Sequence, residues 1–240
     1  MKKVSTVLLL TIVFAAYATA QNATLQEGLA LKYLVQLPTE KSAHPPMIVL
    51  LHGYGSDEKD LFALRTFIPK NYLIISARAP YPLPGGGYEW YEMTDVNGVH
   101  DGNASQLANS KSLIEKFIKE VTSAYHADPA RVCLMGFSQG AIMSYRVGLT
   151  SPSLLKGIGV LSGTIYPSLK PMVKNTAALK HLGIFIAHGT ADERISFADG
   201  KAASDYLKSL GLKPDFHAYP EMGHTISRDV LSDLVKWLTQ

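Results

Sequence analysis

A serine lies in the pattern G-x-S-x-G at Gly136–Gly140, where the sequence is well suited to nucleophilic chemistry. Arg131–Met135 before it predicts a buried strand, and Ala141–Leu149 after it predicts a helix. On such a tight strand-to-helix turn, Ser138 would hold its hydroxyl above the sheet, and the glycines let the backbone close around it. The free N–H groups and partial positive charge of the helix N-terminus would stabilise an oxyanion. The pattern therefore predicts a serine nucleophile.

A serine nucleophile needs a base, and the base needs an acid that orients it. Asp192 follows an apolar strand expected at Ile184–Ala187, and His224 follows the last expected strand, Pro214–Tyr219. Both residues therefore lie on loops past strand ends. The chain order Ser, Asp, His is that of α/β-hydrolases and differs from chymotrypsin-like and subtilisin-like proteases. We predict a catalytic triad of Ser138, His224 as base and Asp192 as acid.

Neighbouring residues offer alternatives to the acid and the base. Glu193 and Asp215 could replace Asp192, but Asp192 follows its strand end directly, whereas Asp215 lies in or before the last strand. His52 and His188 also follow strand ends. We interpret each of these two histidines as a structural turn residue, because neither comes last in the chain order.

The oxyanion donors are predicted to be backbone N–H groups. The first is that of Gln139, the residue after the nucleophile. The second follows the apolar strand Met47–Leu51, which ends in the sequence His52-Gly53-Tyr54-Gly55. A His-Gly turn after an early central strand is where this type of fold keeps its second donor. We therefore expect the N–H of Tyr54 to be that donor.

Alternating strands and helices predict an α/β fold with a doubly wound, mostly parallel sheet and helices on both faces. Leu29–Leu37 is expected as an edge strand, and Tyr72–Ser76 and Gly157–Leu161 as further strands. The longest helix is expected over Ala104–Tyr125, which is amphipathic. No insertion between strands is long enough for a large cap domain. The prediction is an α/β-hydrolase fold without such a cap.

The segment Tyr81–Asp101 is the extended candidate to cover the site. Its first part, within the expected loop Ala79–Gly87, is dense in proline and glycine, and aromatic residues follow. Aromatic side chains on a loop near a catalytic cleft can line an acyl or aryl pocket, or they can pack on the core instead. Both interpretations stay open, and we assign Trp90 and Tyr91 as candidate substrate-binding residues.

The first 20 residues have the features of a secretory signal peptide. Met1-Lys2-Lys3 is basic, Val7–Ala16 is apolar, and Ala18-Thr19-Ala20 is a small-residue cleavage site before Gln21. An uncleaved anchor is the weaker interpretation, because the apolar run is shorter than the roughly 20 residues of a membrane span. We predict a signal peptide over 1–20, one domain over 21–240, export to the periplasm or the medium, and no membrane span in the mature chain.

Composition excludes several classes of protein. The 240 residues are 47% hydrophobic and 18% charged, which suits one sizeable core. The formal net charge of +3 falls to +1 on loss of Lys2 and Lys3 with the leader, and no nucleic-acid-binding motif is present. The histidines are scattered, and the single cysteine, Cys133, can form no internal disulfide. We predict no metal, no cofactor and no nucleic-acid partner.

With these residues in hand, the chain resembles the phospholipase/carboxylesterase family, which includes the acyl-protein thioesterases. The resemblance runs in order over nearly the whole mature chain. The G-F-S-Q-G form around the serine is more specific than the general hydrolase motif. The matching segments are Leu51–Asp57, Trp90-Tyr91, Gly136–Gly140, Leu161–Gly163, His188–Asp192 and Gly223-His224.

The resemblance implies a compact serine esterase that acts on carboxylic or thio-esters with short to medium acyl chains. By position it gives Ser138, Asp192 and His224 the triad roles, and Tyr54 and Gln139 the oxyanion hole. Acyl-protein thioesterases act on cytosolic lipidated proteins, whereas this chain has an export signal, so a general carboxylesterase acting on a small-molecule ester is favoured. Alternatives are an esterase of feruloyl or acetyl groups on plant polysaccharides, and a lysophospholipase.

Two other classes of function are disfavoured. A peptidase on this fold would usually carry a larger cap or a propeller, and no segment of the chain is long enough for either. A non-enzymatic binding domain would have no need of an intact serine, histidine and aspartate in this order. The sequence therefore predicts an enzyme.

Overall fold

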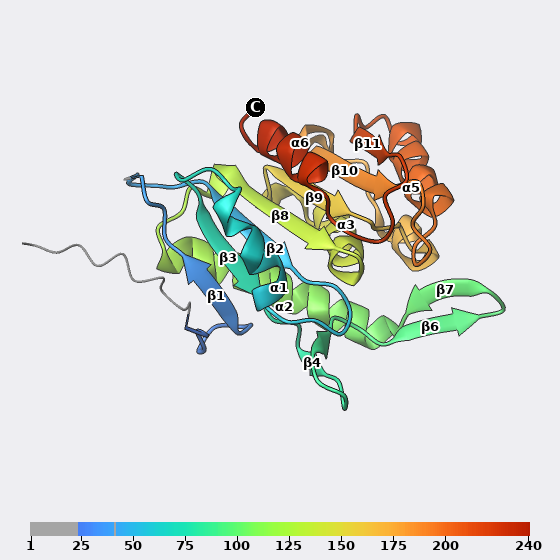
Figure 1. The fold of residues 1–240 in the computed structure, drawn as a ribbon, viewed down its shortest axis with the longest axis horizontal. Helices are drawn as coiled ribbons and strands as arrows, with labels where there is room; N and C mark the ends of the chain where they lie inside the picture. The colour runs from blue at the N-terminus through green and yellow to red at the C-terminus, as the bar shows by residue number, and fades with distance from the viewer. Residues whose placement is uncertain (1–23, 41) are drawn as a thin grey trace, which may run out of the picture.

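The computed structural model describes residues 24–40 and 42–240 (Figure 1). The expected signal peptide, residues 1–20, lies outside the described residues. A seven-stranded sheet forms the centre of the molecule, from the strands β1 (Tyr33–Gln36), β2 (Met47–Leu51), β3 (Leu73–Ala77), β8 (Val132–Phe137), β9 (Gly157–Leu161), β10 (Gly183–Gly189) and β11 (Asp215–Tyr219).

The strand order is β1-β3-β2-β8-β9-β10-β11. β1 is antiparallel to β3 at one edge, and all other neighbours are parallel. The strands β2, β3 and β9 are buried along their whole length, as expected for parallel strands covered on both faces. Because side chains alternate along a strand, Val49 of β2 belongs to the core on one face of the sheet and Leu50 to the core on the other.

Helices cover both faces of the sheet, and each contributes apolar side chains to one of the two cores. One core includes Leu107, Val147, Leu179 and Leu207, which come from α2 (Ala104–Ala124), α3 (Gln139–Thr150), α4 (Ala177–His181) and α5 (Phe197–Ser209). The other core includes Leu61 and Leu234, which come from α1 (Lys59–Phe62) and α6 (Arg228–Leu238). Short 3₁₀ turns complete the connections: η1 (Ala63–Thr66), η2 (Pro129–Arg131), η3 (Pro152–Leu154) and η4 (Pro167–Met172).

The segment after β3 differs from the expected open loop. β4 (Tyr81–Pro82) pairs with β5 (Tyr88–Glu89), and β6 (Met93–Val96) pairs with β7 (Val99–Gly102) as a hairpin. This β6–β7 hairpin extends away from the central sheet in Figure 1. Its turn residues, Asn97 and Gly98, both have positive φ angles, 56° and 78°. Asn-Gly is the typical pair for such a two-residue turn, so this dipeptide is a local signal for the hairpin.

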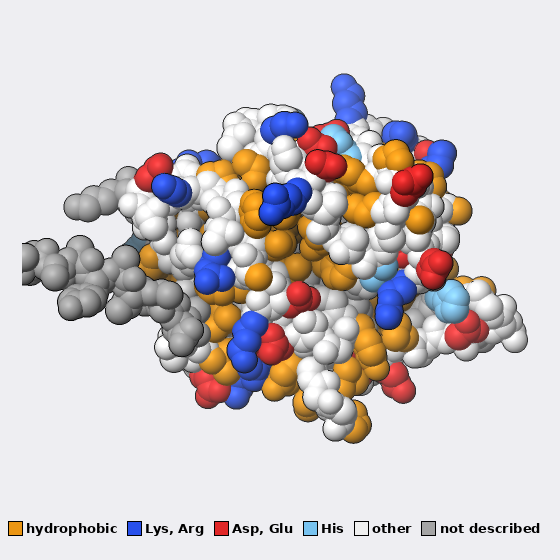
Figure 2. All heavy atoms as spheres, viewed as in Figure 1, with side chains coloured by type: hydrophobic (Ala, Val, Ile, Leu, Met, Phe, Trp, Pro, Cys, Tyr) orange, Lys and Arg blue, Asp and Glu red, His pale blue; other side chains and the backbone are white. Residues whose placement is uncertain are grey.

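Charged side chains of both signs are interspersed on the face shown in Figure 2, and hydrophobic side chains gather near its middle. Within residues 24–40 and 42–240, no helix is long and apolar enough to cross a bilayer. Cys133 is buried in β8, and burial raises the pKa of its thiol to about 11. The thiol is therefore neutral at physiological pH and packs as a small apolar group.

Candidate active site

Ser138 lies between the end of β8 and the start of α3, with φ 54° and ψ −117°. A positive φ is strained for a residue with a side chain, and such strain is typical of functional turns. The Ser138 N–H donates to the carbonyl oxygen of Leu161 at 2.9 Å, which ties the turn to β9. A Cβ added at Gly140 would collide with the carbonyl oxygen of Leu51 and lie 2.6 Å from that of His52. Glycine is therefore required for the turn to approach β2 this closely.

His224 lies between Ser138 and Asp192. Its Nε2 is 2.9 Å from Ser138 Oγ, and its Nδ1 is 2.8 Å from Asp192 Oδ2. A carboxylate only accepts hydrogen bonds, so Nδ1 carries the proton and Nε2 accepts from the serine hydroxyl. The ring of Phe137, whose centroid lies 4.8 Å away, packs against the imidazole. The imidazole is thus held in the tautomer that can take a proton from Ser138.

The Asp192 side chain is fully buried and held on several sides. Its Oδ1 accepts from the backbone N–H groups of Arg194 at 2.9 Å and Ile195 at 3.0 Å. Burial would raise the pKa of Asp192, but the hydrogen bonds from His224 and from these two N–H groups bring the pKa below its ordinary value. Asp192 is therefore a carboxylate at neutral pH, as a partner for an imidazolium must be.

The alternative acids are not in contact with His224. Glu193 is exposed, and Asp215 is an exposed residue at the start of β11 whose carboxylate lies 2.9 Å from His217 Nε2. His188, interpreted above as a turn residue, is buried, and its Nε2 lies 2.9 Å from the carbonyl oxygen of Ile195. His188 Nε2 also lies 3.5 Å from Asp192 Oδ2, but its bond to Ile195 makes it a donor there, and of the histidines only His224 bridges Asp192 and Ser138 in the described residues.

Two backbone N–H groups flank Ser138, those of Gln139 and Tyr54. Gln139 is the first residue of α3, so its N–H has no partner within the helix. Within the described part of the chain, neither N–H donates to another residue. Tyr54, Ser138 and Gln139 all line the same cavity. Both N–H groups thus belong to residues that line the cavity beside Ser138, and their role as oxyanion donors stays a prediction.

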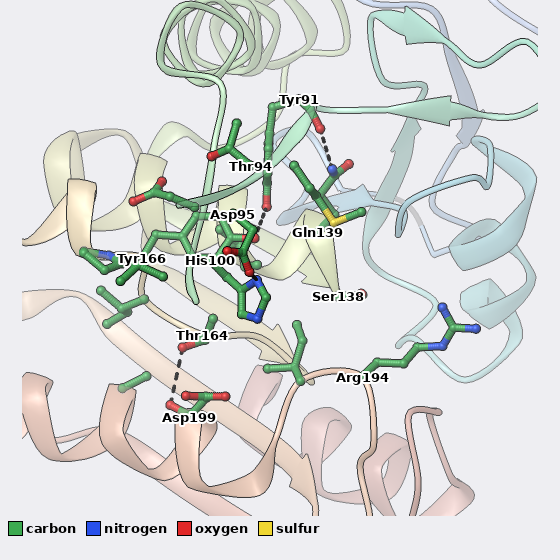
Figure 3. Close-up of a pocket in the computed structure, with 18 of the residues that line it drawn as sticks. Tyr91, Thr94, Asp95, His100, Ser138, Gln139, Thr164, Tyr166, Arg194 and Asp199 are labelled. Atoms are coloured by element: carbon green, nitrogen blue, oxygen red, sulfur yellow. Dashed lines mark hydrogen bonds and ion pairs between the residues drawn. The ribbon is translucent and has the colours of Figure 1, made fainter. Parts of the chain in front are cut away.

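A cavity of about 700 Å³ opens beside Ser138 (Figure 3). Such a volume is typical of sites for small molecules. One wall is supplied by the β6–β7 hairpin, including Thr94, Asp95 and His100, and the opposite side includes Thr164 and Asp199. Apolar side chains complete the lining: Met93, Val99, Ile142, Ile165, Pro167, Ile195, Ala202 and Ala203.

The two aromatic residues assigned to substrate binding lie in different environments. Tyr91 lines the cavity but is 0% exposed, and its hydroxyl donates to that of Tyr166 at 3.4 Å. Trp90 is also 0% exposed, is not part of the cavity lining, and belongs to the core beneath α2 and α3. The core-packing interpretation therefore describes Trp90, because its indole is enclosed on all sides. Tyr91 borders the cavity, but it has no exposed surface, so its contact with a substrate stays a prediction.

Several cavity residues were not foreseen in the sequence. Tyr166 and Lys170 come from the segment around η4, for which no element was predicted, and Arg194 follows Asp192 on its loop. Within the described part of the chain, the Arg194 guanidinium has no hydrogen-bond or ion-pair partner. The position of Arg194, two residues after the predicted acid, could have indicated that it lies near the site. Nothing in the sequence around η4 indicated a cavity wall.

The hydroxyl, imidazole and carboxylate form one continuous line of hydrogen bonds at the rim of the cavity. Such a line can transfer the proton of the hydroxyl to the imidazole while the oxygen attacks an electrophilic carbon. Among residues 24–40 and 42–240, no group of three or more His, Cys, Asp or Glu side chains is arranged to hold a metal ion.

Known proteins resemble this chain in sequence and in fold. The Phospholipase/Carboxylesterase family model matches residues 35–240. An acyl-protein thioesterase 1 from Yarrowia lipolytica is 31% identical over 224 residues, covering 86% of this chain and 96% of the relative. The crystal structure of esterase PE8 aligns with a TM-score of 0.73 at 27% identity, over 85% of this chain and 96% of the other. A carboxylesterase from Mesorhizobium loti, at 22% identity, shares the fold with a TM-score of 0.77 over 91% of this chain and 99% of the other. The chain therefore belongs to the phospholipase/carboxylesterase family of α/β-hydrolases and is a serine hydrolase of the carboxylic-ester class.

Proposed function

We propose that this protein hydrolyses small carboxylic esters, including thioesters, through an acyl-enzyme on Ser138. The observation that carries the proposal is the line of contacts Ser138 Oγ to His224 Nε2 at 2.9 Å and His224 Nδ1 to Asp192 Oδ2 at 2.8 Å, beside a cavity of about 700 Å³. In this proposal Ser138 is the nucleophile, His224 the general base and Asp192 the acid that orients it.

Acylation begins when Ser138 Oγ attacks the carbonyl carbon of the ester and its proton moves to His224 Nε2. The carbonyl oxygen becomes an oxyanion, which the N–H groups of Tyr54 and Gln139 stabilise. The tetrahedral intermediate then collapses. The bond to the alcohol breaks, the alcohol oxygen takes the proton from His224, and the acyl group remains on Ser138. Asp192 stabilises the imidazolium that forms in between.

Deacylation repeats these steps with water as the nucleophile. His224 Nε2 takes a proton from the water, whose oxygen attacks the acyl carbon, and the same N–H groups stabilise the second oxyanion. Collapse of this intermediate breaks the bond to Ser138 Oγ, which takes the proton back from His224. The products are a carboxylic acid and an alcohol or thiol, and no cofactor is consumed.

The cavity supports short to medium acyl chains as substrates. Its apolar lining, such as Ile142 and Ile195, suits an alkyl group close to Ser138. The hairpin side of the same cavity carries Thr94, Asp95 and His100. A long alkyl chain that filled the whole cavity would displace water from these polar groups, which is unfavourable.

A second candidate function follows from that polar wall. His100 Nδ1 lies 3.0 Å from Asp95 Oδ2, and Asp101 also lines the cavity. Carboxylates and imidazoles can bind hydroxyl groups, so the wall favours an ester whose other part bears hydroxyls. Feruloyl or acetyl esters of plant polysaccharides have this chemistry. A lysophospholipase would require the cavity to accept a longer acyl chain as well.

Export from the cytoplasm is proposed from the first 20 residues alone. The basic start, apolar run and small-residue site support cleavage before Gln21. Mass spectrometry of the protein purified from its native host is expected to give an N-terminus within a residue or two of Gln21. Recovery of the full-length chain from the cytoplasm would contradict export and leave the proposed chemistry unaffected.

The chemistry is tested with a fluorophosphonate probe and a substrate panel. The probe should label the wild-type protein at Ser138, and Ser138→Ala should lose both labelling and hydrolysis while its circular dichroism spectrum stays unchanged. The panel comprises p-nitrophenyl esters from acetate to palmitate, with feruloyl and acetyl-xylan esters beside them. Highest kcat/KM on acetate to octanoate supports the first proposal, and highest on feruloyl or acetyl-xylan esters supports the second. Wild-type turnover by a folded Ser138→Ala protein would refute both.

A further inference from the structure

The side chain of Gln139 is buried and uses both ends of its amide. Its Oε1 accepts from the backbone N–H of Trp90 at 2.7 Å, and its Nε2 donates to the carbonyl oxygen of Tyr91 at 2.7 Å, a contact drawn in Figure 3. Paired bonds of this kind fix both the distance and the orientation of the two partners. The segment of Trp90 and Tyr91 is therefore tied to the residue whose own N–H is one proposed oxyanion donor.

The indole of Trp90 continues this connection toward the second donor. Its Nε1–H donates to the carbonyl oxygen of His52 at 2.9 Å, and its own carbonyl oxygen accepts from the hydroxyl of Ser110 on α2 at 2.5 Å. Trp90 is 0% exposed, so these bonds are made out of contact with water. A buried hydrogen bond is costly to leave unmade, which makes the connection rigid.

His52 carries the connection into the peptide unit that bears the second donor. Its Nε2 lies 3.0 Å from the backbone N–H of Ala79, so Nε2 is the acceptor and Nδ1 carries the proton. Nδ1 then donates to the carbonyl oxygen of Gly53 at 2.7 Å. Burial lowers the pKa of His52 and favours this neutral form. The Gly53 carbonyl and the Tyr54 N–H belong to one planar peptide, so holding the oxygen also sets the direction of the N–H.

We infer that Gln139, Trp90 and His52 form one buried hydrogen-bond chain that sets the separation and direction of the two oxyanion donors. Trp90 is then a positioning residue of the oxyanion hole, and it does not bind substrate. The chain runs from the Gln139 amide through the Trp90 indole to the His52 carbonyl and ring, and ends at the Gly53–Tyr54 peptide. The inference rests on the proposed function, because it assumes that these N–H groups stabilise an oxyanion.

The test replaces the indole by a ring without the N–H. Trp90→Phe should lower kcat about tenfold to a hundredfold, while KM changes less than about threefold. This fall in kcat should not exceed the fall that removal of a whole oxyanion donor causes. The affinity for a trifluoromethyl ketone, which forms a tetrahedral adduct, should fall by the same factor as kcat. The control is Trp237→Phe in α6, the only other tryptophan, which lies against Phe185 and away from the site. It should leave kcat and inhibitor affinity as in wild type.

A second variant breaks the chain at its other end and keeps the test decisive if Trp90→Phe does not fold. Gln139→Met retains the backbone N–H of residue 139 but removes both hydrogen bonds of the side-chain amide. It should reproduce the fall in kcat and in inhibitor affinity. The inference is overturned if either folded variant keeps wild-type kcat, or if kcat falls without a matching loss of inhibitor affinity. Failure of the proposed function is distinguishable, because the wild-type protein would then show no labelling of Ser138 by the fluorophosphonate probe.

Discussion

Replacing Asp192 by asparagine isolates the contribution of its charge, because the structure predicts how the amide will sit. The Asp192 oxygen Oδ1 accepts from two backbone N–H groups, so the carbonyl oxygen of the new amide should occupy that position. Its NH₂ group then faces His224 Nδ1 at the 2.8 Å now occupied by Oδ2, while Oδ1, which is 3.0 Å from Nδ1, is already shared by the two backbone N–H groups. An NH₂ group can only donate, so Nδ1 becomes the acceptor and the ring proton moves to Nε2. That nitrogen could no longer accept the proton of Ser138.

The expected cost follows from this change of tautomer. An imidazole held in the wrong tautomer lowers kcat by about 10⁴ in a serine protease with the same arrangement, which is about 5 kcal/mol in the activation free energy. The fold should persist, because the two backbone N–H groups keep their acceptor. A further small loss of stability is expected, because the NH₂ group would also lie near the proton on His188 Nε2, 3.5 Å from the present Oδ2.

The assay is kcat/KM on p-nitrophenyl butyrate for wild type, Asp192→Asn and the control Asp215→Asn, with circular dichroism and thermal denaturation of each. Asp215 is an exposed aspartate that contacts His217 and not His224, so its variant should retain wild-type activity. If a folded Asp192→Asn protein keeps kcat/KM within about tenfold of wild type, below the loss expected from the wrong tautomer, the reasoning about the tautomer is wrong. Loss of activity in Asp215→Asn would instead indicate that the acid has been misassigned.

Further predictions concern the backbone donor, the turn glycine, a buried ion pair and acid stability. Tyr54→Pro removes an N–H and should cost about a hundredfold in kcat, whereas Tyr54→Ala, measured beside it, should retain most of kcat. Gly140→Ala should lower the free energy of unfolding by about 3 kcal/mol or more in urea titrations, because the added methyl group meets backbone that cannot move aside. The Arg78 guanidinium, whose side chain is only 18% exposed, donates to both carboxylate oxygens of Glu58 at 2.6 and 2.8 Å. Glu58→Ala removes this carboxylate and should lower the free energy of unfolding by about 3–5 kcal/mol in the same titrations. The pKa of Asp192 is lowered on folding, so its charge stabilises the folded state above the unfolded-state pKa of about 3.9. This contribution is lost as the pH falls through the folded-state pKa. The unfolding free energies of wild type and Asp192→Asn should therefore converge below about pH 4.

Much of the sheet could be predicted from the sequence because buried parallel strands are continuous apolar runs. Met47–Leu51 and Gly157–Leu161 were predicted with the bounds that the structure has. The triad candidates were also accessible, because each follows a strand, and parallel strands end at one edge of a sheet. Ser138, Asp192 and His224 are far apart in the chain, but chain order and strand ends were enough to select them.

The segment Tyr81–Asp101 was expected to cover the site, and residues of its β6–β7 hairpin line the cavity, but the hairpin itself could not be predicted in the same way. The β6–β7 hairpin has exposed strands and pairs with no strand of the central sheet, so it lacks the apolar pattern on which the other predictions relied. Its Asn97-Gly98 turn is a signal in the sequence, but a turn alone does not tell which residues face a cavity. Trp90 was assigned as a candidate substrate-binding residue, and its burial in the core could not be predicted for a different reason. An aromatic residue near a cleft looks the same in the sequence whether its ring faces a ligand or the core. The deciding contacts of Trp90, with Gln139 and His52, join residues 49 and 38 positions apart.

The reacting groups and the wall that faces them come from separable parts of the chain. The former follow strands of the central sheet, whereas residues Met93–Gly102 form a hairpin held beside the cavity by contacts such as that of Asp101 with the Ser168 hydroxyl at 2.8 Å. Substitutions at the exposed positions of this hairpin, such as Met93 and Val99, should leave the Ser138 turn unchanged, whereas Gly102 packs against Tyr91 and has to stay glycine. An ancestral esterase could therefore acquire new substrates through one short replacement while it retained its chemistry. For directed evolution the same separation defines the library: diversity belongs in the hairpin, and the strand ends are kept constant.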